Sequence, residues 1–260
     1  MSSPKVQLRL NGIRKSFPGK QGPTQVLDGL TFDIHERDFV SIIGPSGCGK
    51  TTVFNIIAGL VDPDEGMLMY RGQEVDSLRG KVGYMMQKDL LFPWRTVLDN
   101  VLLGLETKGV DPRQAMDTAR EYLSTFGLSG FENAYPKMLS GGMRQRVALI
   151  RTLVLDPDIL LLDEPFSALD YQTRLYLEGI LMEAVETFHK TVILVTHDID
   201  EAVALSKRVV VLSQRPARVK AVHDIALNEH SPIAARSDPR FSSYFNTLCA
   251  ELDIQTRASA

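Results

Sequence analysis

The sequence predicts an α/β fold with a parallel core sheet, a small antiparallel β part and an inserted α-helical block. The run Ile159–Leu162 is continuously apolar and Phe39–Ile43 is apolar except for Ser41, as is typical of strands covered on both faces. Near the N-terminus, Val6–Leu10 and Leu30–Ile34 alternate apolar and polar residues, which is typical of half-buried antiparallel strands. Residues 90–157 read instead as a helical block between the two strand-rich parts.

The first third of the chain leads from a buried strand into a helix. Phe39–Ile43 runs into a glycine-rich stretch, and apolar residues then recur at helical spacing as far as Ala58. Gly59 and Asp62-Pro63 are expected to end this helix. A further strand is expected over Lys81–Met86.

The helical block is expected to contain three helices. Thr96–Glu106 has apolar residues at helical spacing. Asp111-Pro112 should open the second helix, with Asp111 as N-cap, and Gly127 should close it. Ser140 should cap the third, which runs to about residue 155.

The last third returns to strands. A long helix over Leu169–Phe188 is expected to connect Ile159–Leu162 to a strand at Val192–Val195. Val209–Leu212 should form another strand, and Phe241–Leu252 a final helix. We therefore expect one domain over residues 1–230, with the helical block inserted at about 90–157, and a helical tail over 231–260.

Composition narrows the function classes. The 260 residues carry a net charge of −3, which argues against a wholly basic nucleic-acid binder. No apolar run approaches the ~20 residues of a membrane span, and the start of the chain has no apolar signal segment. Two cysteines, Cys48 and Cys249, are too few for a disulfide framework. We expect a soluble cytoplasmic chain.

A phosphate-binding loop follows the first buried strand. Residues 44–51 match the pattern of glycine, four residues, glycine, lysine and Ser/Thr, in the required context of strand, loop and helix. The backbone N–H groups of such a loop surround the β- and γ-phosphates, Lys50 adds a positive charge, and the Thr51 hydroxyl can ligate Mg²⁺. A chance glycine loop is the alternative. The expected nucleotide-binding residues here are Gly44, Pro45, Ser46, Gly47, Cys48, Gly49, Lys50, Thr51 and Thr52.

Cys48 lies inside this loop. The N-terminus of the following helix should lower the pKa of its thiol. Alkylation of Cys48 is then expected to inactivate the protein, and MgATP to protect it.

An acidic pair follows the buried strand Ile159–Leu162. Carboxylates at the carboxyl end of a parallel strand would lie beside the phosphate loop. Asp163 can hold Mg²⁺, and Glu164 is placed to polarise the attacking water as general base. A strand that simply ends in solvated acids is the alternative.

A second glycine-containing helix start occurs at Leu139–Arg146. Ser140 offers a hydroxyl, and Gly141 and Gly142 add free N–H groups at the helix end. One chain needs only one such anion cradle per ATP, so the second has a purpose if it closes on a nucleotide held by another copy. An ordinary serine N-cap is the alternative.

These motifs together resemble the nucleotide-binding subunit of an ATP-binding cassette (ABC) transporter, over about residues 6–212. The resemblance implies a P-loop NTPase fold and a head-to-tail dimer, with two ATP molecules between the phosphate loop of one chain and the Ser140 loop of the other. It rests on the phosphate loop, Gln87, Leu139–Gln145, Ile159–Glu164, Ser167–Asp170 and His197.

The resemblance also implies roles for single residues. Gln87 would sense and ligate Mg²⁺ and link to the permease, His197 would be the switch histidine at the γ-phosphate, and both would join Glu164 in catalysis. Asp170 would communicate across the dimer. Phe17 stands where the family often has a tyrosine against adenine, unless it belongs to the core. Met143 departs from the glutamine of many members, which puts one nucleotide contact in doubt.

A cluster of bulky apolar residues follows Gln87. Soluble proteins seldom expose such a cluster without a partner, so we expect it to accept a helix of a membrane permease, unless the loop is tucked into its own core. The cluster consists of Leu90, Leu91, Phe92 and Trp94. It resembles, with Met143, the nitrate/sulfonate/taurine importer branch. That implies separate permease and extracytoplasmic solute-binding subunits, and a peripheral location on the cytoplasmic face of the membrane.

The solute is left open by the sequence. An aliphatic sulfonate or taurine is the leading expectation, ahead of nitrate, bicarbonate or a thiamine-precursor pyrimidine. An exporter or lipid-moving cassette and a non-transport cassette are the remaining alternatives. The second phosphate loop of ribosome-type relatives and the long heptads of DNA-repair types do not occur in the sequence. Arg215 and its basic neighbours interleave with strand residues, so a solvated face is expected there rather than a nucleic-acid site.

Overall fold

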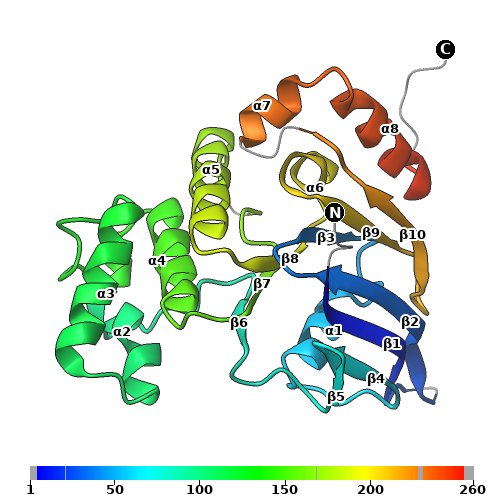
Figure 1. Ribbon diagram of the computed structural model, residues 1–260, viewed down its shortest axis with the longest axis horizontal. Helices are drawn as coiled ribbons and strands as arrows, with labels where there is room; N and C mark the ends of the chain where they lie inside the picture. The colour runs from blue at the N-terminus through cyan, green and yellow to red at the C-terminus, as the bar shows by residue number, and fades with distance from the viewer. Residues whose placement is uncertain (1–4, 21, 168, 228–230, 255–260) are drawn as a thin grey trace.

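The computed structural model describes residues 5–20, 22–167, 169–227 and 231–254, and its core is a six-stranded sheet (Figure 1). The strand order is β10-β9-β3-β8-β7-β6. All neighbours are parallel except β10, which runs antiparallel to β9 at the edge. The strands are β3 (Phe39–Ile43), β6 (Val82–Met85), β7 (Ile159–Asp163), β8 (Thr191–Val195), β9 (Arg208–Leu212) and β10 (Val219–Asp224). The predicted fold class is confirmed, and β3, β7 and β8 are buried along their whole length.

A second, antiparallel sheet has the order β2-β1-β4-β5. Its strands are β1 (Val6–Phe17), β2 (Thr24–His35), β4 (Glu65–Tyr70) and β5 (Gln73–Val75). The first two extend beyond the predicted ranges. The β4–β5 hairpin was not predicted, although Arg71 and Gly72, with φ of 50° and 81°, form the left-handed turn that an X-Gly pair favours. Helix α1 (Lys50–Ile57) packs its apolar face between this sheet and the core sheet.

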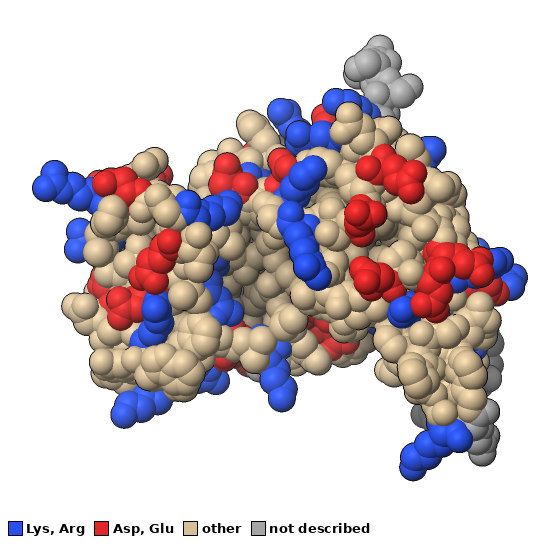
Figure 2. Space-filling view, turned by 90° about the horizontal axis from the view of Figure 1, so that it is seen from below, with Lys and Arg blue, Asp and Glu red and all other residues tan. Residues whose placement is uncertain are grey.

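The helical block stands apart from the sheets, at the left of Figure 1. It comprises α2 (Val97–Thr107), α3 (Pro112–Thr125), the short 3₁₀ helix η1 (Pro136–Met138) and α4 (Gly141–Leu153). The predicted caps are confirmed, since Asp111 accepts from the backbone N–H of Arg113 and Ser140 from that of Met143. Figure 2 shows that the surface is hollowed between this block and the rest, with acidic and basic side chains interspersed.

The remaining helices cover the core sheet. They are α5 (Tyr171–Thr187), α6 (Ile199–Leu205), α7 (Pro232–Ser237) and α8 (Phe241–Glu251). Leu248 and Cys249 of α8 pack with α6 and β9 in one apolar cluster, so the C-terminal helices lie on the domain in Figure 1. The expected boundary at residue 230 lies outside the described residues. None of the described helices is long and apolar enough to cross a membrane.

Candidate functional site

The predicted site residues come together because four neighbouring parallel strands end at the same edge of the core sheet. These strands lie in the order β3-β8-β7-β6. The phosphate loop follows β3, His197 follows β8, the acidic pair closes β7, and Gln87 follows β6. Ligands of open α/β sheets bind at this carboxyl edge.

A cavity of about 550 Å³ lies at the phosphate loop. It contains seven of the predicted nucleotide-binding residues and the predicted general base. The lining residues are Phe17, Pro18, Thr24, Val26, Ser46, Gly47, Gly49, Lys50, Thr51, Thr52, Glu164, Val195 and Arg215. Phe17 is 36% exposed and lines this cavity rather than the core, and Nζ of Lys15 lies over its ring, 5.6 Å from the centroid.

Lys50 is the first residue of α1 and is buried beneath the loop. Its Nζ donates to the carbonyl oxygens of Gly44 at 2.7 Å and Pro45 at 3.2 Å. Gly49 precedes it with a φ of 126°, and a Cβ there would lie 2.9 Å from the side chains of Val26 and Leu27. The loop can therefore fold this tightly only with glycine at position 49.

The expectation of an activated thiol at Cys48 was wrong. The side chain is 1% exposed, belongs to the apolar cluster around α1 and does not line the cavity. Burial raises the pKa of the Cys48 thiol, and this outweighs the opposite effect of nearby Lys50. The backbone N–H groups of Lys50 and Cys48 at the start of α1 also lower the pKa of this thiol, but burial raises it by more.

Asp163 and Thr51 supply oxygen atoms beside the cavity. The Thr51 hydroxyl donates to Oδ2 of Asp163 at 3.1 Å. Burial raises the pKa of Asp163, so a bound cation would stabilise its ionised form. Hydroxyl, carboxylate and amide oxygens suit Mg²⁺, so Thr51, Asp163 and Gln87 fit that ion. In the described part of the chain, no group of three His, Cys, Asp or Glu side chains could hold a metal ion.

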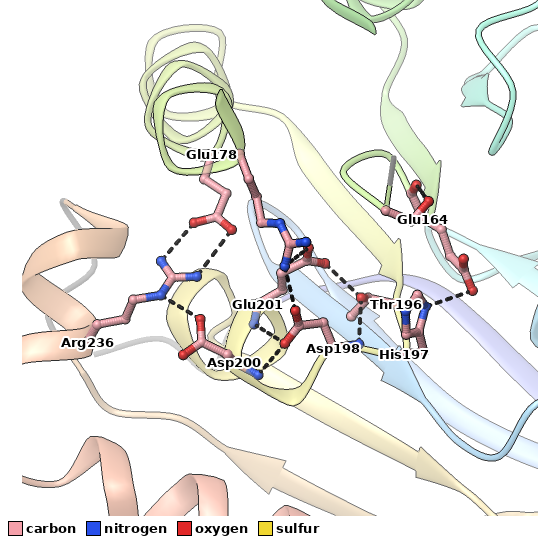
Figure 3. Close-up of polar contacts among 10 residues, drawn as sticks. Glu164, Glu178, Thr196, His197, Asp198, Asp200, Glu201 and Arg236 are labelled. Carbon is pink, nitrogen blue, oxygen red and sulfur yellow. Dashed lines mark hydrogen bonds and ion pairs between the residues drawn. The ribbon is translucent and has the colours of Figure 1, made fainter. Parts of the chain in front are cut away.

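Glu164 is the point at which the three predicted catalytic residues meet. Gln87 donates from Nε2 to its Oε2 at 2.9 Å, and Nδ1 of His197 lies 3.3 Å from its Oε1 (Figure 3). The Glu164 backbone has a φ of 48°, a left-handed conformation that is uncommon for glutamate. The turn after β7 therefore holds this carboxylate at the cavity against a local conformational cost.

His197 is itself 60% exposed, but both of its neighbours are held by buried groups. The Thr196 hydroxyl donates to buried Glu201 at 2.7 Å and accepts from the Asp198 backbone N–H. Asp198 caps α6 and receives Nη1 of Arg174 at 2.6 Å. The histidine side chain is thus presented from a fixed backbone (Figure 3). Helix α6 was not predicted from the sequence, although Asp198 and Glu201 have N-cap spacing.

Glu201 should make stability depend on pH. Burial raises its pKa to about 7, although Thr196 and Arg174 oppose the effect. Between about pH 4.5 and 7 the folded chain keeps a proton that the unfolded chain has lost, so the free energy of unfolding falls as pH rises, by about 3 kcal/mol in all. Glu201→Gln removes this dependence. Its Tm should rise relative to wild type by several degrees between pH 5 and 8, measured by calorimetry.

The control for this prediction is Glu183→Gln, the same change at an exposed residue of α5. Its Tm should follow that of the wild type at every pH. A Tm difference between Glu201→Gln and wild type that does not vary with pH would contradict an elevated pKa at Glu201.

The predicted residues Ser140, Gly141, Gly142 and Asp170 do not line the cavity of their own chain. Ser140 and Asp170 are exposed N-caps of α4 and α5. A Cβ at Gly142 would lie 2.5 Å from the Thr173 side chain, so this glycine lets the two helix starts pack together. Met143, whose contact with nucleotide was in doubt, packs against the apolar core of the helical block. Ala168, between these helices, lies outside the described residues.

Arg215 is a cavity residue that the sequence analysis had placed on a solvated face. Its guanidinium donates from Nε to the carbonyl of Gly47 at 3.2 Å and also from Nη2. The contact joins residues 168 positions apart in the chain, so no local pattern could have shown it.

The loop after Gln87 presents part of its apolar cluster. Trp94 is 71% and Leu90 52% exposed, whereas Leu91 is buried in the core and Phe92 is half-buried beside Trp94. The alternative of a loop tucked into its own core thus applies to Leu91 and partly to Phe92, whereas Leu90 and Trp94 are exposed. Buried Asn100 fixes the loop, because its side chain accepts from the Phe92 N–H and donates to three carbonyls of residues 92–96.

Hydrogen bonds from two arginines of α4 hold the same loop. Nε of Arg144 donates to Asp89 at 3.0 Å, and Arg151 donates to the backbone carbonyls of Asp89 and Leu90. Helix α4, which begins after Ser140, thus contacts the loop that begins after Gln87.

The fold and the site define a nucleotide hydrolase with a phosphate-binding loop. A family model described as "ABC transporter" matches residues 27–167. YtlC of Bacillus subtilis, an "uncharacterized ABC transporter ATP-binding protein", is 45% identical over 239 residues, which cover 91% of this chain and 92% of YtlC. The chain therefore belongs to the ABC transporter family and is an ATP-binding ATPase.

Two further relatives bear on the site. The aliphatic sulfonates import ATP-binding protein SsuB of Bacillus cereus is 44% identical over 217 residues, which cover 84% of this chain and 85% of SsuB. The ATP-binding cassette MJ0796, solved as a dimer in a post-hydrolysis state with ADP and phosphate, has a TM-score of 0.75 and 32% identity. That likeness covers 84% of this chain and 99% of the solved one.

Proposed function

We propose that the chain is the ATP-hydrolysing subunit of an importer for a small solute, with aliphatic sulfonates or taurine first and nitrate-type oxyanions second. The observation that carries the hydrolytic role is the convergence of Gln87 and His197 on the Glu164 carboxylate at the cavity that contains Lys50. The likeness to SsuB supports the solute class and the direction of transport.

In this proposal each residue does one task. Lys50 and the loop N–H groups hold the β- and γ-phosphates. Glu164 accepts the proton of the attacking water, and His197 contacts the γ-phosphate. Phe17 stacks on the adenine. Mg²⁺, held by Thr51, Asp163 and Gln87, would neutralise charge on the phosphate oxygens.

A second copy completes the site in this proposal. Ser140, Gly141, Gly142 and Asp170 lie outside the cavity, and Ser140 stands at a helix N-terminus suited to a phosphate. The dimer of MJ0796 supports pairing of two copies. In the head-to-tail pairing proposed here, the Ser140 loop of one chain closes on the nucleotide of the other. Permease subunits would dock beside Trp94, a binding protein would deliver the solute from outside, and the chain would lie peripherally on the cytoplasmic face of the membrane.

Transport by the assembled complex tests the function. The tagged chain is purified with its permease from detergent-solubilised native membranes and reconstituted in proteoliposomes with its solute-binding protein. Uptake of radiolabelled taurine, ethanesulfonate or nitrate is then measured with MgATP on the cassette side, and a Glu164→Gln complex serves as control. We expect ATP-dependent uptake of a sulfonate. Uptake of nitrate alone would favour nitrate-type oxyanions, the second proposal, over sulfonates. Uptake of none of the three would overturn the proposed solute class.

Trp94→Ala should weaken docking of the permease. An aromatic anchor buried in a partner pocket commonly contributes about 2 kcal/mol or more, so assembly should weaken about 30-fold. Trp94 does not line the cavity, so ATP binding by the isolated subunit should not change. Co-purification with the permease measures the first effect, and titration with a fluorescent ATP analogue measures the second.

Ile233→Ala is the matched control for Trp94, because it removes another exposed apolar side chain from a distant helix. It should assemble normally. If Trp94→Ala assembles and transports like wild type, the permease docks elsewhere.

A further inference from the structure

An arginine of the C-terminal helices reaches the elements that carry His197. Arg236 of α7 donates to both carboxylate oxygens of Glu178, at 2.7 and 3.1 Å, and to Oδ1 of Asp200 at 2.5 Å (Figure 3). Glu178 belongs to α5 and Asp200 to α6. Arg236 therefore connects α7, near the end of the chain, to α5 and α6, the two helices that flank His197, the predicted switch histidine.

The surroundings of Arg236 contain more carboxyl groups than cationic side chains. The carboxyl groups belong to Glu178, Asp198, Asp200 and Glu201, and the cations are Arg174 and Arg236. Glu178 is 0% and Glu201 3% exposed, so water cannot compensate them. Burial raises the pKa of Glu178 even with Arg236 bound. Removal of either arginine would therefore leave a buried acidic side chain without its ion-pair partner.

Arg174 connects this cluster to the switch. It pairs with Asp198, next to His197, at 2.6 Å and lies 3.5 Å from Glu201. It also stands four residues before Glu178 on α5, so the two side chains share one helix face. If Arg236 is removed, the cation on α5 within reach of Glu178 is Arg174. Arg174 could pair with Glu178 only by giving up its ion pair with Asp198.

We propose that Arg236 is a positioning residue for ATP hydrolysis: by occupying Glu178 it keeps Arg174 on Asp198, and so holds His197 at the γ-phosphate. The proposal rests on the role proposed for His197. It gives the C-terminal helices, which lie outside the residues matched by the family model, control over the rate of hydrolysis. Nucleotide binding is not involved, because Arg236, Glu178 and Arg174 do not line the cavity.

The test uses steady-state hydrolysis by the full-length chain. Arg236→Gln should lower kcat roughly tenfold, a size common for coupling through a side-chain network, and leave the affinity for ATP unchanged. Adding Glu178→Gln removes the charge that attracts Arg174, and the neutral amide pair can still form hydrogen bonds. The double variant should therefore recover kcat to within about twofold of wild type.

Arg240→Gln is the matched control. Arg240 belongs to the same C-terminal segment, but it is exposed, and its ion-pair partner among the described residues is nearby Asp238. This variant should keep the wild-type kcat. His197→Ala is measured alongside, and if it hydrolyses ATP normally, the proposed role of His197 fails rather than that of Arg236.

Two results would overturn the role of Arg236. One is a wild-type kcat in Arg236→Gln with only a lower Tm, which would make the residue purely structural. The other is a double variant no faster than the single one. If Arg236→Gln does not fold, Arg236→Lys replaces it, since lysine can hold Glu178 or Asp200 but not both. A smaller fall in kcat, again reversed by Glu178→Gln, is then expected, and an unchanged kcat overturns the proposal.

Discussion

Glu164→Gln is expected to bind MgATP like the wild type and to hydrolyse it 10²- to 10⁴-fold more slowly, the range lost with a general base. The amide keeps the shape of the side chain and can still accept the hydrogen bond from Gln87. It cannot take a proton from water at neutral pH. With both nucleotides retained, the variant should persist as a dimer.

Phosphate release under saturating MgATP measures the rate, and size-exclusion chromatography with and without MgATP measures the dimer. Glu183→Gln, the control at an exposed position of α5, should hydrolyse normally and show no ATP-dependent dimer that outlasts turnover. Hydrolysis by Glu164→Gln at the wild-type rate would remove Glu164 from the mechanism.

Lys50→Ala should lose most of its affinity for ATP. Hydrogen bonds to charged groups contribute about 1.5–3 kcal/mol each, so the dissociation constant should rise roughly 10- to 100-fold. The substitution also leaves the carbonyls of Gly44 and Pro45 without the donor that joins them beneath the loop. Both effects act on the phosphate cradle rather than on the adenine side.

Equilibrium titration with a fluorescent ATP analogue checks this expectation. Lys5→Ala is the control, because Lys5 is an exposed lysine whose ion pair, with Glu36, is on the surface. An unchanged affinity in Lys50→Ala would contradict the assignment of residues 44–51 as the phosphate loop.

The sequence predicted the parts of the fold and site that are encoded locally. Apolar runs, the cap residues Asp111 and Ser140 and the glycine pattern of the phosphate loop act within a few residues, and the structure has strands, helices and loop where these signals stand. The acidic pair was found for the same reason, since Asp163 and Glu164 end a strand that reads as buried.

What was missed depends on tertiary packing. The burial of the Cys48 side chain involves a residue distant in the chain, because Cys48 shares an apolar cluster with Leu212 of β9, and a Cβ on Gly44 would meet both, at 3.0 Å and 3.1 Å. Arg215 reaches the phosphate loop only because β9 lies beside β3. Leu91 is buried while Leu90 is exposed, which depends on how the loop meets the helical block.

If the permease docks at Trp94 as proposed, the hydrogen bonds of Arg144 and Arg151 to Asp89 and Leu90 would give the helical block a mechanical part in transport. A permease helix pressing on Trp94 would push on a loop that is braced against α4, so the load would pass to the start of that helix at Ser140. The block would then act as a lever: force applied where the membrane protein docks would tilt the surface that meets the nucleotide of the partner subunit. Closure of the dimer on ATP would produce the reverse movement, from the surface at Ser140 through the helical block to the permease. This movement would not require the core sheet to deform.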